Sequence, residues 1–232
     1  MTGRLGGLVI AAWLATVSPV VGAAEPEFPP PPQAKVEWVA EDMVMNGIAM
    51  RVRRFESPAS VEQVLGFYKQ RWQDGEKGEL GYAETDALEP WQLLSRVERG
   101  RLLTVQVQPT ASGSWGYLGL SDLPQFKGAP RLGEGFPKLS GSRVLNDIVS
   151  NDPGKRGRSL LIANSLSIGI NAAYYRDHYE NEGWHKVMDE IGGRGALRTL
   201  VYASGREKVS MVILKFEGET HIIAHDVTEG GL

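Results

Sequence analysis

Two segments of the sequence, 107 residues apart, carry the same helical pattern, and this internal repeat constrains the fold more than any other feature. In each segment, a serine that can cap a helix precedes apolar side chains spaced to share one helical face. The caps are Ser60, with Gln63 three residues later, and Ser167. The apolar positions are Val61, Leu65, Tyr68 and Trp72 in the first segment and Ile168, Ala172, Tyr175 and Tyr179 in the second. The pattern predicts two equivalent amphipathic helices.

The match extends beyond the helical faces. Ser57 and Asn164 occupy the same place before the two caps. Gly75 and Gly183 follow the helices where a C-terminal stop is expected. The repeat therefore covers the start, the face and the end of each predicted helix.

Strand pairs are predicted before each helix. Residues 43–45 and 49–55 flank Asn46-Gly47, a strong signal for a tight hairpin turn. Their counterparts are residues 144–149 and 159–162, which we expect to be joined by a longer loop through Asn151-Asp152-Pro153-Gly154. One hairpin is thus predicted to be tight and the other extended.

Alternating apolar residues predict three more strands after each helix. The predicted strands lie at residues 91–97, 103–107 and 115–120 in the first unit and at 197–203, 209–213 and 220–227 in the second. Each unit then reads β-β-α-β-β-β, with residues 42–121 matching 143–228. An antiparallel sheet with one apolar face is satisfied by laying the helix across it. We therefore predict an α+β fold that arose by tandem duplication of this unit.

The chain ends and connections complete the predicted organisation. An apolar run from Leu5 to Val21, preceded by Arg4 and followed by small residues, indicates a signal peptide cleaved after Ala23 or Ala24, with an uncleaved anchor as the alternative. The predicted divisions are a signal peptide (1–24), a proline-rich spacer (25–37), the first α+β repeat (38–121), a Pro/Gly linker (122–138) and the second α+β repeat (139–232). We expect a periplasmic protein with no transmembrane segment after signal cleavage.

Composition excludes several classes of function. The net charge of −3 gives no overall basic character with which to bind nucleic acid, so we expect no nucleic-acid partner. The chain has no cysteine, which excludes disulfides, thiolate catalysis and a lipidated mature N-terminus. Neither observation conflicts with export, since an adequate core can replace disulfides.

Catalytic and metal-binding patterns are lacking in the sequence. The four histidines fall in the second repeat, but His221 and His225 are about 13 Å apart along a predicted strand, which is too far for both to bind one zinc ion. We find no nucleophile motif and no phosphate-binding loop, since Gly192-Gly193-Arg194-Gly195 lacks the required lysine. We therefore predict no enzyme, no metal and no cofactor.

Basic residues and one tryptophan are the candidate binding residues. The basic residues lie in the same hairpin of each repeat, where they can meet anionic lipid, a glycan or an acidic partner. Trp115, flanked by Gly113 and Gly116, is the tryptophan most suited to exposure. The candidates are Arg51, Arg53, Arg54, Lys155, Arg156, Arg158 and Trp115. The alternative is that the basic clusters are ordinary solvated strand faces.

These features predict a non-catalytic, exported interaction or assembly factor of a bacterial envelope complex, with an envelope protein as partner. Duplicated sheets offer extended surfaces and open edges for binding. Two alternatives remain open: a module that binds a small ligand or lipid between helix and sheet, and an unrecognised hydrolase whose polar residues converge only in three dimensions.

Overall fold

The chain folds into one twelve-stranded antiparallel sheet with two α-helices in the part described by the computed structural model, residues 25–73, 81–123 and 130–230. This architecture confirms the predicted α+β class. The predicted signal peptide and Gly75 lie outside the described residues.

Within residues 25–73 and 81–123, the first half contains six strands and one helix. In chain order these are β1 (Lys35–Met45), β2 (Ile48–Ser57), α1 (Val61–Arg71), β3 (Ala83–Leu88), β4 (Trp91–Glu98), β5 (Arg101–Thr110) and β6 (Gly113–Asp122). The second half repeats the order with β7 (Arg143–Asp152), β8 (Lys155–Asn164), α2 (Ile168–Asn181), β9 (His185–Gly192), β10 (Leu197–Ser204), β11 (Glu207–Phe216) and β12 (Glu219–Glu229). The 3₁₀ turn η2 (Gly193–Gly195) connects β9 to β10.

Each half therefore has one strand more than the predicted β-β-α-β-β-β unit, and that part of the prediction was wrong. The additional strands are β3 and β9, which form the two outer edges of the sheet. An edge strand pairs on one side only and need not alternate polar and apolar residues. Most of β9 is exposed, and its sequence lacks the alternation on which the prediction depended.

The two hairpins are equally tight, which corrects the prediction of a longer loop in the second half. Asn46 and Gly47 join β1 to β2, and both have positive φ angles. Pro153 and Gly154 join β7 to β8. Asn151 and Asp152, assigned to the loop by their turn propensity, instead continue the strand because cross-strand pairing with Arg156 and Lys155 outweighs that propensity.

Both predicted helix starts are confirmed. Ser60 accepts a hydrogen bond from the Gln63 backbone N–H, and the Gln63 side chain accepts one from the Ser60 N–H, which forms a capping box. Ser167 caps α2 by accepting from the Ile170 N–H. Gly183 follows α2 with a φ of 77°, a conformation that glycine adopts readily.

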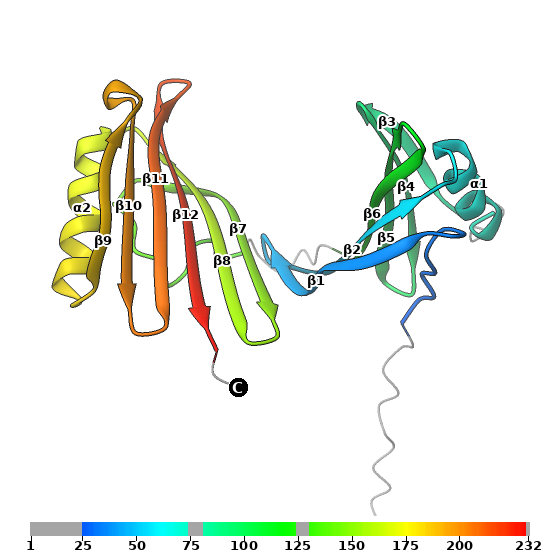
Figure 1. Ribbon diagram of the computed structural model, residues 1–232, viewed down its shortest axis with the longest axis horizontal. Helices are drawn as coiled ribbons and strands as arrows, with labels where there is room; N and C mark the ends of the chain where they lie inside the picture. The colour runs from blue at the N-terminus through cyan, green and yellow to red at the C-terminus, as the bar shows by residue number, and fades with distance from the viewer. Residues whose placement is uncertain (1–24, 74–80, 124–129, 231–232) are drawn as a thin grey trace, which may run out of the picture.

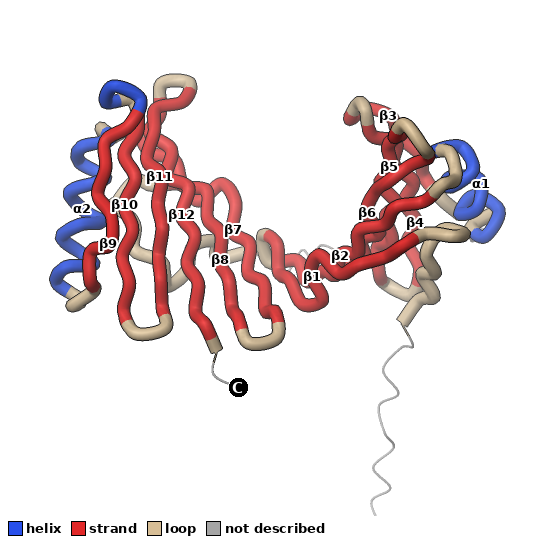
Figure 2. The backbone as a smooth tube through the Cα atoms, viewed as in Figure 1, coloured by secondary structure: helices blue, strands red, loops and turns tan. Residues whose placement is uncertain are grey.

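A short pairing between β1 and β7 joins the two halves into one sheet. The strand order is β3-β4-β5-β6-β2-β1-β7-β8-β12-β11-β10-β9. Met43 lies opposite Ser150, Val44 opposite Val149 and Met45 opposite Ile148, in antiparallel register. Figures 1 and 2 show that the sheet narrows at these two strands and that α1 and α2 lie at its two outer sides.

Each half has its own core between its helix and one face of the sheet. Tyr68 of α1 and Tyr175 of α2 are almost fully buried there. The segments before β1 and β7 contribute to the cores through Phe28 and Phe136, although these residues fall within the predicted spacer and linker. The Pro29 carbonyl accepts a hydrogen bond from the Tyr68 hydroxyl, so the proline-rich segment is packed against the first half.

Candidate functional site

The candidate site lies on the face of the first-half sheet that points away from α1, called the open face below. Strand residues alternate between the two faces. In β5, for example, Val105 and Val107 are buried in the core, whereas Gln106 and Gln108 point to the open face. Polar and aromatic side chains thus gather where no helix covers the sheet.

Three aromatic rings form the centre of the open face. Trp115 and Tyr117 lie two residues apart on β6, and Trp91 begins β4. The ring centroids of Trp91 and Trp115 are 5.0 Å apart, and the Tyr117 centroid lies 5.5 Å from Trp115 and 5.8 Å from Trp91. All three residues remain partly exposed. We call these three residues the aromatic cluster.

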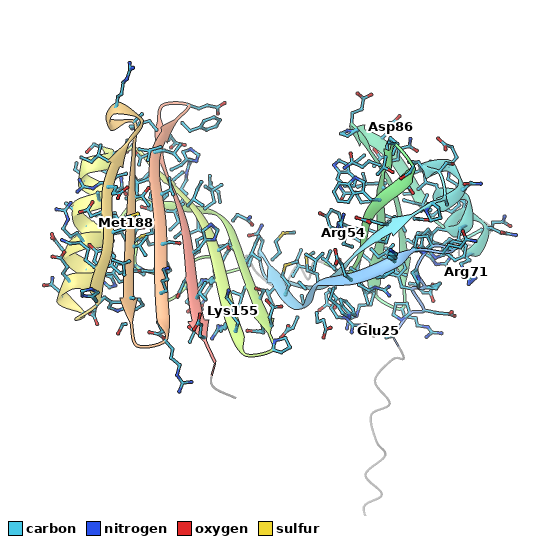
Figure 3. The ribbon with its side chains drawn as sticks, viewed as in Figure 1. Glu25, Arg54, Arg71, Asp86, Lys155 and Met188 are labelled. Carbon is cyan, nitrogen blue, oxygen red and sulfur yellow. The ribbon has the colours of Figure 1, made fainter. Side chains whose placement is uncertain are left out.

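Arg54 of β2 covers one side of the cluster. Its guanidinium carbon lies 5.3 Å from the centroid of the Trp115 ring, in a cation–π contact. The same guanidinium donates to Glu37 Oε1 at 2.8 Å and to Glu56 Oε1. These hydrogen bonds, to Glu37 first and then to Glu56, raise the pKa of Arg54. Figure 3 shows Arg54 on the inner side of its half, opposite the side that carries α1 and Arg71.

A groove of about 700 Å³ runs beside Trp115. Its lining is mostly polar or charged and comes from the start of β1, the end of β2 and the β5–β6 hairpin. The lining residues are Gln33, Lys35, Arg54, Glu56, Ser57, Pro58, Thr110, Ser112, Ser114 and Trp115. The groove and the aromatic cluster are continuous through Trp115.

Gly119 has no side chain, so the β6 backbone is uncovered on the open face next to the aromatic cluster. It lies in β6 between Val52 of β2 and Thr104 of β5. A Cβ atom built there would meet only atoms of Thr104, at 3.9 and 4.0 Å, so packing does not require glycine. Glycine inside a strand costs stability, and it often marks a place where a ligand approaches the backbone.

The second half does not reproduce this arrangement. The positions equivalent to the aromatic cluster, 106 residues later, hold Leu197, His221 and Ile223. Leu161 replaces Arg54, and His225 fills the place that Gly119 leaves bare. The site therefore belongs to the first half and is not a consequence of the fold.

The structure brings together two of the predicted binding residues, Arg54 and Trp115. Arg51 pairs with Glu25, and the Arg53 guanidinium donates to the Phe28 carbonyl on the helix-covered side. Burial lowers the pKa of Arg53.

The basic residues of the second half lie away from the site. Arg158 is held by Asp147 and by the Glu134 carbonyl. Lys155 and Arg156 are exposed at the β7–β8 turn, where Figure 3 labels Lys155. In each half, then, some of the candidate arginines hold the segment that precedes the first strand.

Sequence reasoning missed Trp91, Tyr117, Glu37, Glu56 and Gly119. The spacing of Trp115 and Tyr117 was a usable signal, since residues two apart in a strand share a face. Trp91 and Glu37 reach the site only through the order of strands in the sheet, which the sequence pattern does not contain.

One serine–histidine contact occurs on the second half. The Ser159 hydroxyl lies 2.9 Å from His225 Nδ1 across the β8–β12 pair, at an exposed position. Within residues 25–73, 81–123 and 130–230 no hydrogen bond joins His225 to a carboxylate that would orient it as a catalytic base. Among the same residues, no cluster of histidine and acidic side chains with the proximity to hold a metal ion is present.

Comparisons with known protein families, with curated proteins and with solved structures find no match to this chain. In the described part of the chain, neither helix has the length and apolar character needed to cross a membrane.

Proposed function

We propose that this protein is a non-catalytic, exported interaction or assembly factor of a bacterial envelope complex, and that it binds through the open face of its first half. The observation that carries the proposal is the half-exposed aromatic cluster, held by Arg54 and bordered by a polar groove. Aromatic residues and arginine are the side chains most enriched at the centres of binding surfaces.

Export is supported by the residues that follow the predicted cleavage sites. Glu25, immediately after Ala24, pairs with Arg51, and Pro26 is buried. Cleavage after Ala23 or Ala24 would leave these contacts intact, so the folded part accommodates the periplasmic form that we propose.

Tandem duplication is supported by equivalent contacts in the two halves. The Ser114 hydroxyl donates to the Ala59 carbonyl, and the Thr220 hydroxyl donates to the Leu166 carbonyl. The donors are 106 residues apart and the acceptors 107. We infer that the second half kept a scaffold role while the first half acquired the binding face.

The alternatives receive less support. A lipid or other apolar ligand needs an enclosed apolar cavity, whereas the groove beside Trp115 is open to solvent and most of its lining residues are polar or charged. A hydrolase needs a base with an orienting partner, and the contact between Ser159 and His225 supplies only part of that set.

The proposal is tested by comparing matched variants in the two halves. A Trp115→Ala, Tyr117→Ala double variant removes two rings of the aromatic cluster, and a His221→Ala, Ile223→Ala variant changes the equivalent positions of the second half. We expect the first variant to lose cross-linking to envelope components and the second to retain it. Equal cross-linking by wild type and both variants, all folded by circular dichroism, would overturn the proposal.

A further inference from the structure

The charges of the open face are balanced internally. Lys35 and Arg54 carry positive charge, and Glu37 and Glu56 carry negative charge. Because Arg54 is already bound to both carboxylates, it is not available to neutralise an anion. This arrangement disfavours phosphate or anionic lipid as the ligand, and favours a neutral molecule.

The remaining groups suit a ligand with both apolar faces and many hydroxyl groups. Aromatic rings carry negative potential on their faces, which attracts the C–H groups on the face of a sugar ring. Gln106 lies opposite Tyr117 and Gln108 lies opposite Trp115 in the neighbouring strand. A primary amide both donates and accepts hydrogen bonds, as pairs of sugar hydroxyls require.

Because Gly119 has no side chain, there is space above its backbone on the open face. A sugar that carries only hydroxyl groups would leave this space empty. The space above it is bordered across the sheet by the Val52 side chain and by Thr104. Val52 offers an apolar contact for a methyl group. The Thr104 hydroxyl lies 3.4 Å from the Ser95 hydroxyl, and its lone pairs can still accept a hydrogen bond from an amide N–H. An acetamido group matches this combination.

We propose that the open face binds a neutral glycan that contains N-acetylhexosamine units. Trp115 and Tyr117 stack on the sugar rings, Gln106 and Gln108 bind hydroxyl groups, and the space at Gly119 receives the acetamido group. The inference rests on the proposed function, because it names the occupant of the same face. An added protein strand is disfavoured, since the aromatic cluster lies on the face of the sheet and β6 is already paired on both edges.

The test compares two tetrasaccharides with the same β-1,4 linkage, chitotetraose with acetamido groups and cellotetraose without them. Isothermal titration of the full mature chain should give binding of chitotetraose at least about ten-fold tighter than that of cellotetraose. Trp115→Ala should weaken chitotetraose binding by about ten-fold or more.

Gly119→Val separates binding from folding. The new side chain has room for its Cβ atom and favours strand structure, so the melting temperature should not fall, while chitotetraose binding should be lost. The matched control His221→Ala, at the equivalent of Trp115, should bind as wild type does.

Three results would overturn the inference: no binding of either sugar at millimolar concentration, equal affinity for both sugars, or unchanged chitotetraose affinity in Gly119→Val. If the sugars fail to bind while cross-linking still depends on Trp115 and Tyr117, a protein occupies the face and the proposed function stands. If that cross-linking dependence is also absent, both proposals fall.

Discussion

Asn164 and Asn171 hydrogen-bond to each other reciprocally inside the second half. The Asn164 side-chain amide donates to Asn171 Oδ1 at 2.8 Å, and the Asn171 amide donates to Asn164 Oδ1 at 3.0 Å. Both side chains are buried. The equivalent positions of the first half hold Ser57 and Val64, so the same place in the fold accepts either a polar pair or a serine beside an apolar residue.

This equivalence predicts strong coupling between the two asparagines. Asn171→Val alone leaves the buried Asn164 amide with fewer partners and should cost about 1–3 kcal/mol of unfolding free energy, and Asn164→Ser should have a similar cost. The double variant recreates the pair of the first half. Its loss of unfolding free energy should be about 1 kcal/mol smaller than the sum of the losses in the two single variants. Urea unfolding of the wild type, the two single variants and the double variant measures this coupling. Additive losses of unfolding free energy would contradict the prediction.

A second prediction concerns acid stability. Asp147 accepts two hydrogen bonds from Arg158 and one from the Gly133 N–H. The bonds from Arg158, and to a lesser extent that from Gly133, hold the pKa of Asp147 below its ordinary value of 3.8. A carboxylate with a lowered pKa stabilises the fold above its unfolded-state pKa, and this contribution is lost as the pH falls toward the folded-state value.

The unfolding free energy of the wild type should therefore decrease below about pH 4, and Asp147→Asn should flatten that decrease. At pH 7 the same variant should lose about 2–4 kcal/mol, because Arg158 is left without its carboxylate partner. Chemical unfolding at a series of pH values measures both effects. If the unfolding free energies of wild type and Asp147→Asn changed in parallel with pH, the Asp147–Arg158 pair would not be the cause of the loss of stability in acid.

Local features of the fold were predictable from sequence because local physics decides them. Ser60 and Gln63 specified the start of α1 through a capping box, and Asn46-Gly47 specified a hairpin through its positive φ angles. The arrangement of the strands was not predictable in this way. Arg54 and Trp115 are 61 residues apart in sequence and meet only because β2 pairs with β6.

Composition was misleading at the segments before the first strand of each half. Prolines and glycines predicted a spacer and a linker, yet one phenylalanine in each segment enters a core. Phe28 contacts Tyr68 and Trp72 with ring centroids 5.9 and 6.0 Å apart, and Phe136 lies 6.2 Å from Tyr175. A single apolar residue in a polar context has no periodicity from which its burial can be predicted.

Truncation of either phenylalanine tests this packing. Phe28→Ala and Phe136→Ala should each lower the unfolding free energy by about 3–4 kcal/mol, because each leaves a cavity beside a buried tyrosine. The control is Phe216→Ala, since Phe216 is 55% exposed and should change stability by no more than about 0.5 kcal/mol. Equal effects of all three substitutions in thermal unfolding would contradict a core role for Phe28 and Phe136.

Gly116 and Gly119 of β6 should respond oppositely to substitution, although they are three residues apart. Gly116 faces the core, and a Cβ atom there would lie 1.9 Å from the Gln106 carbonyl oxygen and 2.9 Å from the Phe55 ring. Gly116→Ala should therefore cost about 3 kcal/mol or more, since backbone and a buried ring must both move. Gly119→Ala meets no such obstacle and should leave stability unchanged or raise it by up to about 1 kcal/mol. Urea unfolding of the two variants measures the difference. A loss of stability in Gly119→Ala would mean that packing requires glycine at this position. The binding role of the open face would then rest on the aromatic cluster alone.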